Sequence, residues 1–351
     1  MRKSFRERYS VDVHSIAESI QMGEVYGRRG ARFVYDNPAL NWCEAKDYTS
    51  NILDTEGLAK MVDDTDAIED EFLLLPSKMP KLSDVPLGAE DKNRYANVIP
   101  NPETRVRLTL RKGEDNSDYI NANFLRGYLS SPQGYIATQA PLEGTCADFW
   151  RMAWEQRCQI IIMLTGLEEH GLSKCAEYWP NTDGGDVVRI HGDFEITQQR
   201  RQVKTEWIMS MITLRYLKTN QCHEILHFWM TAWPVNGLPD ARTVIHFLLA
   251  LRPHLEETTA APIIHCSPGT GRTGTLIAID LGMLSYDDTK MVDVLASVYR
   301  MRQDRGGMVQ TREQYEYIYR VSTQTLVGPR RPGRHMSSGR LDIASTVPGF
   351  P

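Results

Sequence analysis

The segment from His265 to Arg272 reads His-Cys-Ser-Pro-Gly-Thr-Gly-Arg and places a thiol and a guanidinium six residues apart. The preceding residues 262–264, Pro-Ile-Ile, are typical of the end of a buried strand, and the sequence from Arg272 onward predicts a helix. Backbone N–H groups converge in such a strand-loop-helix turn, and the helix adds the positive end of its dipole. Gly269 and Gly271 relax the φ limits of a tight loop. The segment therefore predicts a binding site for a tetrahedral anion.

In this loop Cys266 would lie under a phosphorus atom and Arg272 beside two of its oxygens. Arginine suits this place better than lysine because its planar fork binds phosphate through two hydrogen bonds. The positive surroundings favour the thiolate over the thiol at neutral pH, and a thiolate can attack phosphorus to form a thiophosphate ester. The alternative is an inert buried cysteine before a glycine-rich turn, and the neighbouring motifs argue against it.

Further segments stand in the order and spacing of the tyrosine-specific protein phosphatases, which this chain resembles from about residue 71 to residue 326. They are Lys92-Asn-Arg-Tyr95, Asp118-Tyr-Ile-Asn-Ala122, Tyr135-Ile-Ala-Thr-Gln-Ala-Pro141, Asp148-Phe-Trp150, Lys174-Cys-Ala-Glu-Tyr-Trp-Pro180 and Met308-Val-Gln-Thr311. Within this family, Glu71-Phe-Leu-Leu-Leu-Pro76, Ile99-Pro-Asn-Pro102 and Asp304-Arg-Gly-Gly-Met308 most resemble the subgroup with a kinase interaction motif. The resemblance implies hydrolysis of phosphotyrosine in proteins through a cysteinyl-phosphate intermediate.

The resemblance also implies roles for single residues. Tyr95 would stack on the phosphotyrosine ring as one wall of a deep slot, and Asn97 would hold the substrate main chain. Glu169 would brace the loop arginine, and Lys174 would contact the mobile acid loop. The implied catalytic residues are Cys266, Arg272, His265, Thr273 and Gln310. The implied phosphate and substrate contacts include Ser267, Pro268, Gly269, Thr270, Gly271 and Gln314. Gln310 and Gln314 would position water for the second step.

Two positions depart from the family's pattern. The acid loop of the family reads Trp-Pro-Asp, whereas the matching segment here is Trp233-Pro-Val235, and valine cannot protonate a leaving phenolate. Pro268 stands in the phosphate cradle and removes a backbone N–H that could face the phosphate. Asp240, five residues after Val235, is a weak candidate for a substitute acid, and the alternative is that it is a solvated turn residue. Asn236 cannot supply an acidic proton.

Three functions follow from a retained nucleophile and arginine with a missing acid. We predict a protein-tyrosine phosphatase with reduced turnover. The first alternative is a catalytically impaired pseudophosphatase that binds phosphotyrosine proteins. The second is a signalling regulator that docks mitogen-activated protein (MAP) kinases through residues 2–13, where Arg6-Glu-Arg8 and Val11-Asp-Val13 resemble a kinase docking motif. A plain solvated basic arm would have the same composition.

The 351 residues and 41% hydrophobic content predict one large α/β (α+β) domain. Strand candidates lie at 105–110, 134–138, 158–164, 187–190, 194–198, 205–216 and 222–230, and helical patterns at 55–72, 146–156, 241–255, 273–284, 292–302 and 312–323. Together with the resemblance they predict a phosphatase-type domain over residues 55–326, with a highly twisted mixed sheet flanked by helices on both faces. Residues 1–54 are predicted to be an extended or disordered arm, and residues 327–351 a disordered tail.

Composition limits the partners. A net charge of −5 gives no reason to expect nucleic acid or an anionic membrane as the main partner. The six cysteines lack the spacing of a zinc site or a disulfide framework, so we expect no metal and no cofactor. No apolar run is long enough to span a bilayer, and the start lacks a signal peptide. We expect a cytoplasmic protein, although a soluble piece of a longer membrane protein would have the same features.

Overall fold

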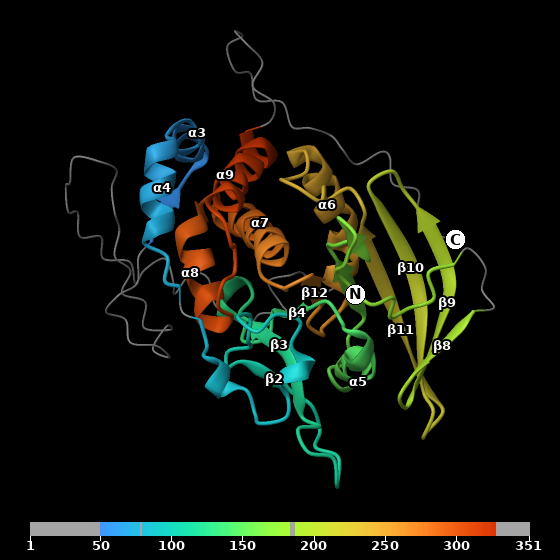
Figure 1. The fold of residues 1–351 in the computed structure, drawn as a ribbon. Helices are drawn as coiled ribbons and strands as arrows, with labels where there is room; N and C mark the ends of the chain where they lie inside the picture. Colours follow the sequence, from blue (N-terminus) through green and yellow to red (C-terminus); the bar gives the residue numbers. More distant parts are fainter. Residues whose placement is uncertain (1–49, 78, 183–186, 328–351) are drawn as a thin grey trace.

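The structure is a computed structural model that describes residues 50–77, 79–182 and 187–327 (Figure 1). The predicted docking motif in residues 2–13, the rest of the predicted arm up to residue 49 and the predicted tail after residue 327 lie outside the described residues. Of the predicted arm, residues 50–54 are described: β1 (Ile52–Leu53) pairs with β13 (Val292–Asp293), and Asp54 caps the next helix.

A mixed sheet of nine strands forms the centre of the domain, in the order β2-β3-β4-β12-β5-β11-β10-β9-β8. β4, β12, β5 and β11 run parallel to their neighbours within this group, and the pairs outside it are antiparallel. The strands are β2 (Arg105–Arg107), β3 (Tyr119–Leu125), β4 (Tyr135–Gln139), β5 (Ile160–Met163), β8 (Val188–His191), β9 (Phe194–Val203), β10 (Trp207–Tyr216), β11 (Gln221–Met230) and β12 (Ile263–Cys266). Two short strands, β6 (Glu168–Glu169) and β7 (Leu172–Ser173), form a separate hairpin.

Helices cover both faces of the sheet, as predicted (Figure 1). Alternate residues of the central strands face opposite ways: Ile160 and Ile162 pack into one core cluster, and Ile161 packs into the other. One cluster is completed by α5 (Cys146–Glu155), and the other by the remaining long helices. These are α3 (Thr55–Asp63), α4 (Thr65–Leu73), α6 (Ala241–Glu257), α7 (Gly271–Thr289), α8 (Val294–Asp304) and α9 (Arg312–Val327).

The predicted elements differ from the observed ones in two instructive places. The helix predicted from residue 292 begins at Val294, because Asp293 ends β13 and accepts a hydrogen bond of 2.8 Å from the backbone N–H of Ala296 as the helix cap. The strand candidates omitted β3, whose buried Asn121 and Asn123 are poor strand formers. Their side chains are used in the site described below.

Within residues 50–77, 79–182 and 187–327, no helix combines the length and apolar character needed to cross a bilayer. The same residues contain no group of three or more His, Cys, Asp or Glu side chains arranged to hold a metal ion.

Candidate active site

The loop from Cys266 to Gly271 joins the central strand β12 to the start of α7, as the sequence predicts. Cys266 is 2% exposed and ends the strand. Gly269 has a φ of +73°, and a Cβ atom there would lie 2.1 Å from the carbonyl oxygen of Thr138, so no other residue fits. The loop is thus pressed against the end of β4 and has a fixed shape.

Arg305 holds this loop from beneath. Its side chain is fully buried and donates hydrogen bonds to the carbonyl oxygens of Gly269 at 2.9 Å and Pro268 at 3.1 Å. The same guanidinium donates to the side-chain oxygens of Asn121 and Asn123, both at 2.8 Å. Burial lowers the pKa of Arg305 to about 10, which leaves it charged at neutral pH. A permanent cation therefore lies behind the loop.

Arg272 lies at the start of α7 and makes the predicted contact with Glu169. Its Nη1 is 2.6 Å from Oε1 of Glu169, and its Nη2 is 3.1 Å from Oε2. Burial acts to raise the pKa of Glu169, but the hydrogen bonds and charge of Arg272 outweigh it, and the pKa lies below its ordinary value. The carboxylate is therefore ionised and fixes the plane of the guanidinium.

Tyr95 reaches the loop from the segment between α4 and β2. Its hydroxyl is 2.9 Å from Oγ of Ser267, and Ser267 in turn donates to the carbonyl oxygen of Lys174 at 3.1 Å. Tyr95 is half-buried, and Asn97 close by is exposed. The structure thus brings the predicted slot wall beside the predicted phosphate loop.

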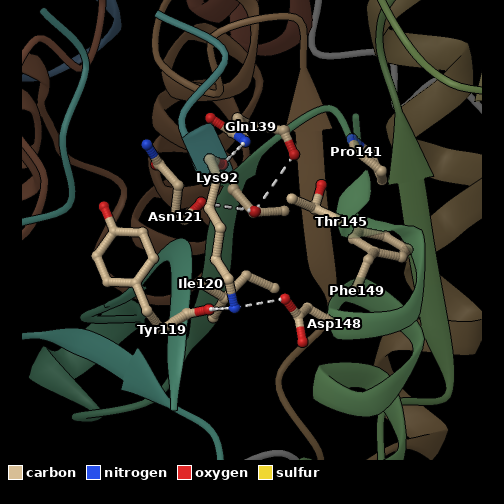
Figure 2. Close-up of a pocket in the computed structure, with 10 residues that line it drawn as sticks. Lys92, Tyr119, Ile120, Asn121, Gln139, Pro141, Thr145, Asp148 and Phe149 are labelled. Atoms are coloured by element: carbon tan, nitrogen blue, oxygen red, sulfur yellow. Dashed lines mark hydrogen bonds and ion pairs between the residues drawn. The ribbon is translucent and has the colours of Figure 1, made fainter. Parts of the chain in front are cut away.

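The segment that carries Tyr95 is mounted on β4 and α5 (Figure 2). Gln139 accepts a hydrogen bond of 2.9 Å from the backbone N–H of Arg94, and its side-chain amide donates to the carbonyl oxygen of Lys92 at 2.8 Å. Nζ of Lys92 pairs with Asp148 at 2.9 Å. These contacts hold Lys92 and Arg94 and so set the position of the tyrosine that follows them.

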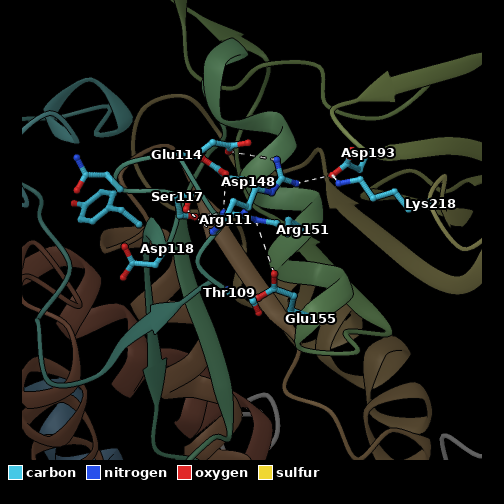
Figure 3. Close-up of polar contacts among 12 residues, drawn as sticks. Thr109, Arg111, Glu114, Ser117, Asp118, Asp148, Arg151, Glu155, Asp193 and Lys218 are labelled. Atoms are coloured by element: carbon cyan, nitrogen blue, oxygen red, sulfur yellow. Dashed lines mark hydrogen bonds and ion pairs between the residues drawn. The ribbon is translucent and has the colours of Figure 1, made fainter.

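Asp148 also belongs to a wider polar cluster that supports this side of the site (Figure 3). It accepts a hydrogen bond of 3.2 Å from Arg151, which is buried on α5. Farther out, Arg111 and Lys218 both contact Asp193, each at 2.8 Å. The cluster links the turns between strands to α5, behind the segment that carries Tyr95.

Gln310 and Gln314 lie over the end of the phosphate loop. A Cβ atom at Gly271 would lie 2.8 Å from Nε2 of Gln314 and 3.2 Å from Oε1 of Gln310. Oε1 of Gln314 also accepts a hydrogen bond of 2.8 Å from the backbone N–H of Gln310. The structure therefore brings this predicted pair to the predicted nucleophile loop.

Two hydroxyl groups of the site are buried without a protein partner. Thr270 is 1% exposed and Thr273 is fully buried, and among the described residues neither hydroxyl has a hydrogen-bond partner. Both residues were predicted site residues.

His265 supports the loop from the core. Its Nε2 is 2.8 Å from the hydroxyl of Tyr178, and the same hydroxyl is 2.7 Å from Nε2 of His227. Burial lowers the pKa of both histidines to about 3, so both rings are neutral. The other ring nitrogen of His265 faces the carbonyl oxygen of Cys266 at 3.4 Å. His265 is thus held by Tyr178 beside the backbone of Cys266, the predicted nucleophile, and the sequence did not indicate the partners Tyr178 and His227.

The acid loop carries Val235, and hence no carboxylate, at the position that matches the aspartate of the Trp-Pro-Asp pattern. Arg272 donates from Nη2 to the backbone carbonyl oxygens of Pro234 and Val235, both at 3.2 Å. The Val235 side chain is 43% exposed. Asp240 lies at the N-terminus of α6, where its side chain accepts a hydrogen bond of 2.9 Å from the backbone N–H of Arg242. Asp240 thus has a capping role, which favours the alternative to a substitute acid.

Lys174 lies where the sequence places it, between β7 and the core. Its backbone N–H donates to Leu167 at 2.8 Å, and its carbonyl accepts from Ser267. No contact of its ammonium group with the acid loop occurs among the described residues, so that role remains a prediction.

Comparisons with known proteins agree with this geometry. A model of the family described as "Protein-tyrosine phosphatase" matches residues 89–324. Mouse tyrosine-protein phosphatase non-receptor type 5 is 39% identical over 277 residues, which cover 77% of this chain and 50% of the relative. Human tyrosine-protein phosphatase non-receptor type 7 is 37% identical over 257 residues, which cover 72% of this chain and 69% of the relative. Human receptor-type tyrosine-protein phosphatase eta is 40% identical over 230 residues, 65% of this chain and 17% of the relative.

Proposed function

The chain belongs to the protein-tyrosine phosphatase family, and we propose that it hydrolyses phosphotyrosine in proteins slowly, through a cysteinyl-phosphate intermediate on Cys266. In the first step the thiolate attacks phosphorus, the bond from phosphorus to the phenolic oxygen breaks, and the phenolate leaves. In the second step water attacks the thiophosphate and releases inorganic phosphate and the thiolate.

The charged groups around the loop support the proposal that it binds phosphate. Arg272 is oriented by Glu169, and Arg305 adds a buried positive charge behind the loop. The loop also lies at the N-terminus of α7, where backbone N–H groups and the helix dipole favour an anion. These positive groups would therefore stabilise the negative charge of the phosphoryl group in the transition state.

The observation that carries the proposal of slow turnover is the place of Val235. Its carbonyl oxygen is hydrogen-bonded to Arg272, so the acid loop reaches the site, yet the residue brings only an apolar side chain. The leaving phenolate must take its proton from water. Loss of a positioned acid costs about 10²–10⁴ in rate, or roughly 3–5 kcal/mol of barrier.

The test compares the unaltered protein with Val235→Asp on two substrates. One is a small aryl phosphate whose phenol is acidic and leaves readily, and the other is a phosphotyrosine peptide, whose phenol is weakly acidic. A good leaving group needs little protonation. We expect Val235→Asp to raise the rate of the first step, phenol release in a single turnover, about 10²-fold or more with the phosphopeptide and much less with the activated ester. Absence of turnover by both proteins on both substrates would refute the enzymatic proposal. Val235→Asn, which matches aspartate in size without an acidic proton, is the control.

A pseudophosphatase is the second candidate, and it is favoured by the combination of an intact Arg272–Glu169 pair with Val235 at the acid position. It predicts that a phosphotyrosine peptide binds without releasing phosphate, and that Arg272→Ala abolishes the binding. Phosphate release at a rate that Cys266→Ser eliminates would exclude it.

Docking to a MAP kinase through residues 2–13 is proposed from the sequence motif, and the similarity to non-receptor types 5 and 7 supports the subgroup in which the resemblance places the chain. Deletion of residues 2–13 should abolish kinase capture, whereas Cys266→Ser should leave it intact. Capture that survives the deletion would refute the motif. The non-receptor relatives also favour the proposed cytoplasmic location, although the chain spans only about half the length of the mouse type 5 relative.

A further inference from the structure

A hydrogen bond joins the acid loop to the hairpin that carries Glu169. Nε2 of His170, in the turn between β6 and β7, lies 3.2 Å from Oδ1 of Asn236, the residue after Val235. We propose that His170 and Asn236 form a clasp that holds the acid loop closed over the phosphate site and slows the escape of a bound phosphotyrosine. The proposal rests on the proposed function for the identity of the ligand.

The hairpin of β6 and β7 is held in place by its tight turn and by hydrogen bonds at its base. His170 and Gly171 have φ values of +53° and +71°, the pair of left-handed residues that makes a tight two-residue hairpin turn. At its base, Glu169 accepts from the hydroxyl of Thr165 at 3.2 Å and holds Arg272. The carbonyl oxygen of Thr165 accepts a hydrogen bond of 2.9 Å from Trp229 on β11. The imidazole is therefore presented from a hairpin that is tied to the sheet.

Few hydrogen bonds hold the acid loop, residues 234–239. Within the described part of the chain, the hydrogen bonds of residues 234–239 are the two from Arg272 to the loop carbonyls and the one between Asn236 and His170. Gly237 follows with a φ of +85° and open space where a side chain would be. Leu238 then packs against the core, so the three hydrogen bonds position the part of the loop before Gly237.

Two of these three bonds involve the arginine that would also bind the phosphate. Nη2 of Arg272 is shared among Glu169, Pro234 and Val235, so its bonds to the loop change when an anion takes part of its donor capacity. The hydrogen bond between His170 and Asn236 does not use Arg272, so it does not compete with an anion for that donor. It is therefore the contact able to keep the loop closed on an occupied site.

The experiment measures association and dissociation of a phosphotyrosine peptide in a Cys266→Ser background, which removes the nucleophile and keeps Arg272. His170→Ala and Asn236→Ala are each expected to speed dissociation about two- to tenfold, the range of one net hydrogen bond, with a smaller change in association. The double variant should dissociate no faster than either single variant. His170→Gln, which keeps a nitrogen donor at a similar reach, should restore slow dissociation, and His246→Ala, an exposed histidine of α6, should change nothing.

A second measurement needs no ligand. The indole N–H resonance of Trp233, a buried residue at the start of the acid loop, should shift in the same direction in His170→Ala and Asn236→Ala. Unchanged dissociation with an unchanged Trp233 resonance, or effects of the two substitutions that simply add, would overturn the clasp. If the peptide binds none of the proteins, the proposed function fails, and the Trp233 resonance alone decides whether the clasp exists.

Discussion

The guanidinium of Arg272 donates a hydrogen bond of 3.2 Å to the backbone carbonyl oxygen of Val235. The residue that would hold the phosphate therefore also holds the residue that replaces the acid. Because this contact uses only the main chain, it does not depend on which side chain occupies position 235. On the proposed function, the loop would close over the site and still deliver no proton, so phosphate binding would be retained while turnover is slowed.

The first prediction concerns the order of the two chemical steps. With an aryl phosphate whose phenol leaves readily, the attack of Cys266 needs little help, whereas hydrolysis of the thiophosphate still lacks a carboxylate to take the proton from water. We expect a burst of about one phenol per protein followed by a steady rate about 10²–10⁴ slower. Rapid mixing with optical detection measures the burst, and mass spectrometry should find phosphate on Cys266.

Val235→Asp should speed the steady phase, and Cys266→Ser should abolish the burst. Linear phenol release from the first turnover would contradict the prediction, because it would place the slow step before the intermediate forms.

A second prediction concerns Pro268. Its carbonyl oxygen is held by Arg305, so the loop keeps its path, but its ring nitrogen offers no hydrogen to a bound anion. Pro268→Ala should therefore tighten the binding of inorganic phosphate or vanadate by about ten- to a hundredfold, since a hydrogen bond to a charged group contributes about 1.5–3 kcal/mol. Calorimetry measures the affinity. Pro132→Ala, at an exposed turn, is the matched control, and equal affinities of Pro268→Ala and the unaltered protein would show that this N–H does not face the anion.

Much of the site could be predicted from the sequence because its parts are local or belong to a family pattern. The strand, the loop and the helix around Cys266 follow from residues 262–284, and the Glu169 brace followed from the resemblance. The capping role of Asp240 was within reach too, since an aspartate before a helical pattern is a common N-cap.

The missed contacts are tertiary. Asn121 and Asn123 made β3 look unlike a strand. Their side-chain oxygens accept hydrogen bonds from Arg305 beneath the phosphate loop, and this contact between distant parts of the chain has no local sequence signal. The bond between His170 and Asn236 similarly joins two turns 66 residues apart, and neither turn has a local pattern that announces the other.

The third prediction is a loss of stability in acid. His227 and His265 are fully buried and their pKa values are lowered from 6.5 to about 3, so the unfolded chain binds protons that the folded protein excludes. Their contribution to stability is fully present above about pH 6.5 and is lost as the pH falls toward about 3. Each histidine should steepen the fall of the unfolding free energy by about 1.4 kcal/mol per pH unit in this window.

His227→Gln keeps a group that can bond to Tyr178 and removes one titration. Urea unfolding from pH 5 to pH 8 should show a shallower pH dependence for this variant, and the exposed His246→Gln should keep the original slope. A slope unaffected by His227→Gln would mean that this ring takes up its proton without unfolding the protein.

The last prediction assigns two consequences to Arg305. Replacing it with methionine leaves the oxygens of Asn121 and Asn123 and the carbonyls of Pro268 and Gly269 without their donor in a buried place. We expect a loss of about 3–5 kcal/mol in unfolding free energy, because each unpaired buried acceptor costs about 1–3 kcal/mol and some of them will find water.

Phosphate affinity should fall as well, since the loop loses both its shape and a nearby positive charge. Arg252→Met removes a half-buried arginine that pairs with Asp280 at 2.8 Å, so it should lower stability and leave phosphate affinity unchanged. If Arg305→Met and Arg252→Met lower phosphate affinity equally, Arg305 acts only through general stability and the support of the phosphate loop lies elsewhere.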